Sequence, residues 1–190
     1  LRKMKNLKTF AIALFLTVAT VASAQTKKVN ASKSKITWIG KKVTGQHEGT
    51  VNLKEGSLLF KGTKLIGGTF TVDMTSLTST DLTGEYQGKL NGHLKSEDFF
   101  GTEKYPTSKL TFKKVTEKGN GVYTVTANLT IKDVTSPVTF DITVKEGTAN
   151  ANVKINRTKY GIKYGSGSFF DNLGDKAISD EFELNVTLQF

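Results

Sequence analysis

The stretch VYTVTANLTIK, residues 122–132, alternates apolar and polar side chains from Tyr123 to Ile131. The odd-numbered positions carry Tyr, Val, Ala, Leu and Ile, while the even-numbered positions between them carry Thr or Asn. Successive side chains of a β-strand point to opposite faces of the sheet. This pattern therefore predicts a strand with one buried and one solvated face.

The same period of two recurs along the chain. It is found in GGTFTVDM (67–74), PVTFDITVK (137–145) and EFELNVTLQF (181–190). Glycine-containing turns of hairpin length, EKGNG and VKEGT, follow the strand candidates. Antiparallel strands with a single buried side have this signature, so the chain is predicted to be all-β, folded as a closed barrel or a sandwich.

One segment, residues 83–106, has no strand period. Within it, Ser96 precedes Glu97, Asp98, Phe99 and Phe100, which is the pattern of an N-cap followed by a single helical turn. We expect a short helical segment near residues 83–100 that packs on, or plugs, one end of a barrel.

The first 24 residues have the pattern of a secretory signal peptide. Cations at positions 2, 3, 5 and 8 precede an uncharged apolar run, and Ala22, Ser23 and Ala24 form a small–x–small cleavage site. We expect cleavage after Ala24, which leaves residues 25–190 as a single domain in the periplasm or outside the cell. The apolar run is shorter than the roughly 20 residues of a membrane-spanning helix, so no membrane span is expected after cleavage. A retained anchor is the alternative.

Composition excludes several classes of function. The net charge is +10, but no basic cluster is interleaved with aromatic residues, so nucleic-acid binding is not expected. There is no cysteine, and neither His47 nor His93 stands in a motif with metal-ligand spacing. Asp171 and Asp175 in the glycine-rich stretch 164–175 form either a carboxylate pair or an ordinary polar loop. We therefore expect no catalytic residue, no metal and no cofactor.

A strand candidate that ends in an arginine raises a separate question. In ANVKINRTKYG (151–161), the apolar face of Ala151, Val153 and Ile155 continues to Arg157. Arginine is rarely fully buried unless it is paired. Two interpretations stay open: an internal ion pair with Asp98 or Asp73, or contact with the head group of a ligand.

Four segments resemble the YceI-like family of exported bacterial proteins. They are GHLKSEDFFGTEKYP (92–106), ANLTIKDVTSPVTF (127–140), INRTKYGI (155–162) and DEFELNVTLQF (180–190). The resemblance extends over residues 34–190. It implies a lipocalin-like antiparallel β-barrel of about eight strands with an elongated apolar cavity. It also implies binding of an amphiphilic isoprenoid-type lipid, such as a polyprenyl chain or a quinone, without catalysis.

In such a barrel, inward-facing apolar side chains would line the ligand cavity. The predicted lining residues are Trp38, Phe70, Val72, Phe112, Phe140, Phe182 and Leu184. Arg157 and His93 are the candidates for binding the head group or for a structural polar anchor; for His93 the structural role would be a hydrogen bond to the backbone.

Whether a cavity exists depends on the size of the inward-facing residues. The small residues Gly68, Ala127, Ala149 and Ala151 are expected to leave room. The alternative is a barrel filled by its own aromatic side chains, which would be a structural or interaction module acting through its outer face or the rim loop 165–175. The oligomeric state is left open, a homodimer included.

Overall fold

The computed structural model describes residues 23–190, and the structural statements below concern these residues. The predicted signal peptide, apart from Ser23 and Ala24, lies outside them, so its cleavage stays a prediction. The strands of the described chain are β1 (Ala24–Lys28), β2 (Lys35–Lys42), β3 (Gly45–Lys61), β4 (Lys64–Ser79), β5 (Thr107–Gly119), β6 (Val122–Ile131), β7 (Val134–Lys145), β8 (Thr148–Asn156) and β9 (Ile178–Gln189).

Helical structure is confined to short segments. They are η1 (Ala31–Lys33), α1 (Gly84–Lys95), η2 (Arg157–Tyr160) and η3 (Gly174–Lys176). Within residues 23–190, no helix has the length and apolar character needed to cross a membrane.

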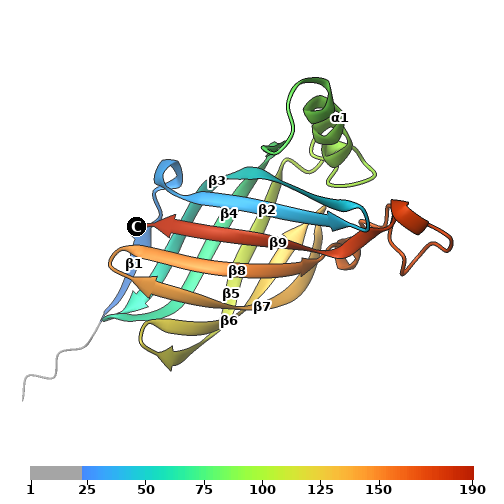
Figure 1. Cartoon of the computed structure of the whole chain (residues 1–190). Coiled ribbons are helices and arrows are strands. Elements are labelled where there is room, and N and C mark those ends of the chain that lie inside the picture. Colours follow the sequence, from blue (N-terminus) through green and yellow to red (C-terminus); the bar gives the residue numbers. More distant parts are fainter. Residues whose placement is uncertain (1–22) are drawn as a thin grey trace, which may run out of the picture.

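The sheet closes into a barrel (Figure 1). Its order is β1-β3-β2-β9-β8-β7-β6-β5-β4, and β3 also pairs with β4, so the eight strands β2 to β9 form a continuous antiparallel ring. Strand β1 pairs only with the second half of the long strand β3, at residues 57–61. Of the two architectures that the alternation allowed, the barrel is confirmed.

The alternation seen in the sequence sets which side chains enter the barrel. In β6 the five apolar residues Tyr123, Val125, Ala127, Leu129 and Ile131 are all buried, and the residues between them are half-buried. Because every ring strand has a neighbour on both sides, these inward residues form a single core rather than two layers.

Packed aromatic side chains lie at the end of the barrel that holds the C-terminus. The rings of Phe60 and Phe190 lie 5.5 Å apart, and Lys27 Nζ lies 5.1 Å from the centroid of each. Nearby, the Leu65 amide donates to Tyr123 Oη at 3.4 Å. These contacts cover part of this end of the barrel.

Helix α1 stands at the opposite end, as Figure 1 shows. Two of its side chains bind the last residue of β4: Asn91 Oδ1 accepts from the Ser79 amide at 2.7 Å, and Gln87 Nε2 donates to the Ser79 carbonyl at 2.8 Å. The predicted helical segment over one barrel end is thus present. We call α1 and the turns that follow it to residue 106 the lid.

The predicted role of Ser96 is wrong. Ser96 is the C-cap of α1, and both its amide and its hydroxyl donate to the His93 carbonyl, at 3.2 and 2.8 Å. The helix precedes this residue, and turns follow it, with the Gly101 amide donating to the Ser96 carbonyl at 2.8 Å. A serine side chain can satisfy groups at either helix end, so its identity alone did not specify which end it caps.

Candidate functional site

An apolar cavity of about 180 Å³ lies inside the barrel. Each of the eight ring strands contributes to its wall, and Leu94, Phe99 and Phe100 of the lid cover it from one end. A dry apolar cavity of about 150 Å³ is large enough to bind benzene. The barrel interior is therefore not filled by its own side chains. The cavity accepts a group about the size of benzene directly, whereas a longer chain requires the lining side chains to move.

The structure places all seven predicted lining residues in this wall: Trp38, Phe70, Val72, Phe112, Phe140, Phe182 and Leu184. Their contact with a ligand stays a prediction. The sequence reasoning missed several further wall residues, among them Ile36 and Met74, which occupy inward positions of the same alternating strands. It also left out the lid residues Phe99 and Phe100 as lining, although their position over a barrel end was expected.

The expectation that small residues open the interior is only partly correct. A side chain at Gly68 would meet the ring of Phe112 at 2.9 Å and that of Phe70 at 3.1 Å, so these aromatic rings already occupy its space. Of the four small residues, only Ala151 borders the cavity, while Ala127 and Ala149 are fully buried within the packed wall.

Arg157 is buried, with 3% of its surface exposed, as the continued apolar face of 151–157 predicted, although β8 ends at Asn156 and Arg157 is the first residue of η2. Its Nε, NH1 and NH2 groups donate to the carbonyls of Ser179, Ile162 and Ile178, at 2.8, 3.0 and 3.0 Å. The guanidinium also borders the cavity and lies 5.7 Å from the centroid of the Phe99 ring. It therefore ties η2 to the start of β9 directly beneath the lid.

The predicted ion-pair partners of Arg157 are wrong. The carboxylate near its guanidinium belongs to Asp180, whose Oδ1 is 3.8 Å from Arg157 NH2. Asp73 instead accepts from the amide and hydroxyl of Thr75, at 3.0 and 2.7 Å, and Asp98 lies beside His93. The pairing of β8 with β9 is the signal that could have identified Asp180, because it brings Asn156 opposite Glu181.

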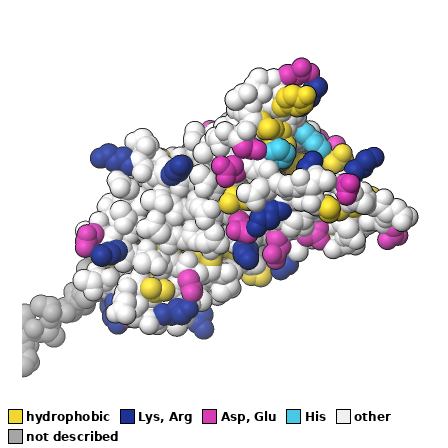
Figure 2. Space-filling view, viewed as in Figure 1, with side chains coloured by type: hydrophobic (Ala, Val, Ile, Leu, Met, Phe, Trp, Pro, Cys, Tyr) yellow, Lys and Arg dark blue, Asp and Glu magenta, His cyan; other side chains and the backbone are white. Residues whose placement is uncertain are grey.

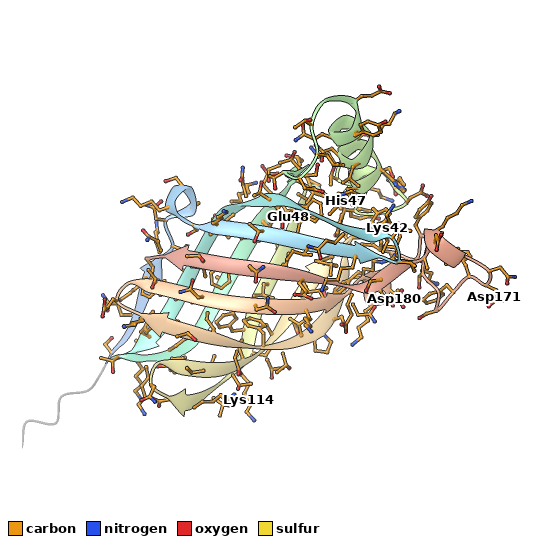
Figure 3. The ribbon with its side chains drawn as sticks, in the orientation of Figure 1. Lys42, His47, Glu48, Lys114, Asp171 and Asp180 are labelled. Atoms are coloured by element: carbon orange, nitrogen blue, oxygen red, sulfur yellow. The ribbon has the colours of Figure 1, made fainter. Side chains whose placement is uncertain are left out.

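Burial and charge act together on this pair. Burial lowers the pKa of Arg157, and the neighbouring Asp180 carboxylate opposes that change. The hydroxyls of Ser166 and Ser168, with the Arg157 guanidinium, lower the pKa of Asp180 below its usual value of 3.8. Ser168 Oγ donates to Asp180 Oδ2 at 2.6 Å. Figure 3 shows Asp180 where the rim loop returns to β9, with Asp171 at the outer tip of that loop.

The lowered pKa of Asp180 predicts a pH-dependent contribution to stability. A carboxyl with a lowered pKa in the folded state stabilises the fold above its unfolded pKa, and this is lost as the pH falls through the folded pKa. We expect the Asp180→Asn variant to have a lower free energy of unfolding than the wild type at pH 7. This difference in stability should become smaller when the pH is lowered to about 3. Urea unfolding at both pH values measures it, with Asp171→Asn at the exposed loop tip as control. An equal Asp180→Asn deficit at both pH values would contradict the prediction.

His93 lies outside the cavity wall, in the last turn of α1. Its ring packs edge-on against Tyr164 and Phe99, with centroids at 4.5 and 5.0 Å, and its Nε2 is 4.0 Å from Asp98 Oδ2. The structural role expected for His93 is a hydrogen bond from its side chain to the backbone. No such hydrogen bond is present among residues 23–190. His93 instead joins the lid to the β8–β9 connection through aromatic packing.

The indole donor of Trp38, a residue of the cavity wall, is unpaired among the described residues. Trp38 is 8% exposed, and its Nε1 has no hydrogen-bond acceptor among the described residues. In the ladder Trp38 pairs with Gly49, which pairs with Ser79 at the base of the lid. Ser79 Oγ is likewise buried without a partner in the described chain. Two unpaired polar groups therefore flank Gly49 in one row beneath α1.

The described residues do not assemble a cluster of metal-ligating side chains. No group of three or more His, Asp or Glu side chains comes together within residues 23–190. His47 Nδ1 lies 2.7 Å from Asp81 Oδ2, but this pair is partly exposed and Asp81 also accepts from the Glu48 amide, which joins β3 to the turn that leads into α1. Figure 2 shows histidine side chains, in cyan, on the surface at the lid end. Asp171 and Asp175 are both exposed.

Together, the fold and the cavity define an antiparallel eight-stranded β-barrel with a lidded apolar interior. The family model of the YceI-like domain matches residues 28–190, and the chain belongs to this family. The predicted family resemblance is thereby confirmed.

Sequence relatives match parts of the chain. A UPF0312 protein of Shewanella denitrificans is 33% identical over 100 residues, which cover 52% of this chain and 50% of the relative. The UPF0312 protein plu2095 of Photorhabdus laumondii is 50% identical over 46 residues, which cover 24% of this chain and 23% of the relative. The chain thus spans about half the length, or less, of the curated relatives it matches.

Solved structures share the fold at lower identity. BcnA of Burkholderia cenocepacia superposes with a TM-score of 0.63 at 22% identity, over 84% of this chain and 98% of BcnA. A polyisoprenoid binding domain from Saccharophagus degradans superposes with a TM-score of 0.55 at 15% identity, over 85% of this chain and 95% of that domain. These likenesses establish the barrel fold.

Proposed function

We propose that this protein is a non-catalytic binding protein that holds an amphiphilic isoprenoid-type lipid, a polyprenyl chain or a quinone, inside its barrel. The observation that carries the proposal is the lidded cavity, whose wall is apolar on all eight ring strands. The polyisoprenoid binding domain of similar fold supports it. The N-terminal pattern supports a location in the periplasm or outside the cell.

The energetics of apolar burial suit such a ligand. Each buried methylene group contributes about 0.8 kcal/mol, so one five-carbon isoprene unit contributes roughly 4 kcal/mol. Association and ordering cost about 4–15 kcal/mol. Two or three buried isoprene units contribute roughly 8–12 kcal/mol, which exceeds the lower part of that cost without any polar contact.

Lipid extraction with mass spectrometry tests the proposal. The purified full-length chain is expected to carry an isoprenoid-type lipid in a defined ratio. Ala151→Phe puts a ring where Ala151 borders the cavity and should reduce the bound lipid at least about tenfold, since overpacking leaves no room for a chain. Lys154→Phe adds a ring to the exposed face of the same strand and is the matched control.

The result that would overturn the proposal is a wild-type barrel that is repeatedly purified empty and takes up no added polyprenyl lipid or quinone. Equal lipid content in Ala151→Phe and wild type would show that the lipid binds elsewhere. Thermal unfolding of both variants separates lost binding from lost folding, because Ala151→Phe is expected to cost about 1–3 kcal/mol of stability.

A second candidate is an interaction module that acts through its rim loop. It is favoured by Phe169 and Phe170 of the rim loop, which are 48% and 51% exposed. Binding of another protein by an empty barrel, lost in a Phe169→Ser, Phe170→Ser double variant, would favour this function over lipid binding.

A further inference from the structure

We infer that the protein docks by its lid end on the surface of a lipid bilayer that carries anionic head groups, with the rim loop in contact with the bilayer. This inference goes beyond the proposed function, because it concerns the outside of the barrel and does not depend on what the cavity holds. It follows from exposed aromatic side chains, from lysines without ion-pair partners and from the hydrogen bonds that hold the rim loop.

Four large apolar side chains are exposed at this end of the barrel. They are Val43, Tyr164, Phe169 and Phe170, which are between 47% and 65% exposed, and we call them the rim patch. Val43 lies in the β2–β3 turn, and its amide donates to the Ala177 carbonyl at 3.2 Å, which joins this turn to the end of the rim loop. Single exposed apolar residues are ordinary, but a group of them on adjoining loops indicates a contact surface.

Hydrogen bonds hold the part of the rim loop that carries Phe169 and Phe170. Both of their amides donate to the Ser166 carbonyl, at 3.1 and 3.0 Å. Ser166 is fully buried, and Ser168 Oγ donates to Asp180 Oδ2 at 2.6 Å. Ordering of loops and side chains opposes binding, so a loop that is already held by such contacts lowers this cost. The two exposed rings are therefore presented before a partner arrives.

Lysines adjoin the rim patch. Lys42 lies at the end of β2, and Lys163 and Lys176 stand on either side of the rim loop. Lys163 Nζ is 4.5 Å from the centroid of the Phe169 ring. All three lysines are exposed, and within residues 23–190 none of them forms an ion pair. Figure 2 shows Lys or Arg side chains, in dark blue, beside hydrophobic ones, in yellow, at this end.

Two carboxylates of the rim loop offset this positive charge in part. Asp171 lies at the outer tip of the loop, as Figure 3 shows, and both it and Asp175 are exposed. Lys159 of η2 is a further exposed cation in the same connection between β8 and β9. Residues 158–177 together with Lys42 carry four lysines and two aspartates, so the net charge of this surface is +2.

An anionic bilayer fits this combination better than another protein does. Lysine is depleted in protein–protein interfaces. At a bilayer surface, by contrast, aromatic rings enter the head-group region, and each lysine near an anionic leaflet adds attraction. Lysine can also keep its ammonium group in water while its stem covers apolar surface. The pairing of exposed rings with unpaired lysines therefore indicates a lipid surface.

The rim patch is continuous with the lid. The ring of Tyr164 packs against those of His93 and Phe99, with centroids at 4.5 and 5.8 Å. Phe99 in turn borders the cavity. Docking through the rim patch would therefore bring the lidded end of the barrel against the bilayer.

The chain contains no cysteine, which allows a local test. Gly167→Cys places one thiol in the rim loop, where a Cβ would meet no atom within 4 Å, and Thr63→Cys places one in the β3–β4 turn at the other barrel end. Each full-length variant is labelled with the environment-sensitive fluorophore NBD. It is then titrated with vesicles of phosphatidylcholine alone, or of equal parts phosphatidylcholine and phosphatidylglycerol.

We expect the emission of the rim-loop label to shift to the blue and brighten on anionic vesicles, while the label in the β3–β4 turn does not respond. The apparent affinity should be at least about tenfold higher for the anionic vesicles than for phosphatidylcholine, and it should fall as salt is added. Because the readout is local, attachment of the chain to vesicles through another segment would not reproduce it.

The aromatic contribution is tested in the Gly167→Cys chain. Phe169→Ser combined with Phe170→Ser should weaken binding to anionic vesicles at least about tenfold, because the apolar area that enters the bilayer is lost. Ile66→Ser, which removes an exposed apolar side chain near the other barrel end, is the control and should leave the affinity unchanged.

The contribution of charge is tested in the same chain. Replacement of Lys42, Lys163 and Lys176 by Gln should weaken binding to anionic vesicles at least about tenfold and leave the weak binding to phosphatidylcholine unchanged. The control removes the same number of charges at the other barrel end and should have little effect: Lys28→Gln, Lys33→Gln and Lys61→Gln.

A rim-loop label that does not respond to anionic vesicles would overturn the inference, and the exposed rings would then belong to a contact with another protein. An equal response of the labels at both barrel ends would overturn it as well, and so would equal affinity for the two kinds of vesicle. Lipid held in the cavity is measured separately by extraction, so the inference and the proposed function can fail independently.

Discussion

Arg157→Met is expected to lower the free energy of unfolding by about 3–5 kcal/mol. The substitution keeps an unbranched apolar stem but removes every donor. The carbonyls of Ser179, Ile162 and Ile178 then lose their hydrogen bonds, and the Asp180 carboxylate loses its neighbouring cation. Buried polar groups left without partners cost about 1–3 kcal/mol each, which is why the expected effect is large.

Urea unfolding followed by circular dichroism measures the change. Lys154→Met, on the exposed face of the strand that leads to Arg157, is the matched control and should change stability by less than about 0.5 kcal/mol. Arg157→Lys should recover little, because a single ammonium group cannot reach three carbonyls in the geometry of the planar fork. Equal stability of the Arg157→Met and Lys154→Met variants would show that the three carbonyl contacts contribute nothing.

Gly49→Ala is the second substitution with a large expected effect, about 3 kcal/mol or more. A Cβ atom at this position would lie 2.5 Å from Cζ2 and 2.6 Å from Cε2 of Trp38, and closer still to the Thr78 carbonyl oxygen. Rotation of the Trp38 ring would displace other side chains of the cavity wall, and the carbonyl belongs to the β3–β4 pairing that closes the barrel. Neither the Trp38 ring nor the Thr78 carbonyl can therefore move away from the added Cβ without disturbing other contacts.

Gly88→Ala in α1 is the control for Gly49→Ala. No atom lies within 4 Å of a Cβ placed there, and alanine is favoured over glycine inside a helix by about 0.5–1 kcal/mol, so this variant should be slightly more stable than wild type. Trp38 is the single tryptophan of the chain, so its fluorescence reports directly on its environment. Gly49→Ala with wild-type stability and an unchanged emission spectrum would refute the close packing of Trp38 on Gly49.

The candidate site could be predicted from the sequence as far as it depends on alternation. Phe70, Phe140 and Phe182 were expected to face inward because each lies on the apolar face of a period-two segment, and each borders the cavity. The same rule predicted the burial of Arg157. Side-chain direction in a strand follows from the backbone of that strand alone, so a short window of sequence is enough to determine it.

Partners and empty space could not be predicted in this way. Asp180 rather than Asp73 or Asp98 lies beside Arg157, because the register of β8 on β9 places the start of β9 opposite the end of β8. Gly68 leaves no room because the rings of Phe70 and Phe112 turn into its space. Both outcomes depend on residues far apart in the sequence.

The sequence by itself determined that the chain is all-β with one apolar face on each strand, that residues 83–106 interrupt this pattern, and which side chains point inward. These properties are local, because they follow from the period-two geometry of extended backbone. Only the tertiary structure decided that β3 pairs with β4 to close the ring, that Ser96 ends a helix, and that a cavity of about 180 Å³ remains. Closure and cavity volume depend on strand register and on how side chains from all eight strands pack together, which no single segment specifies.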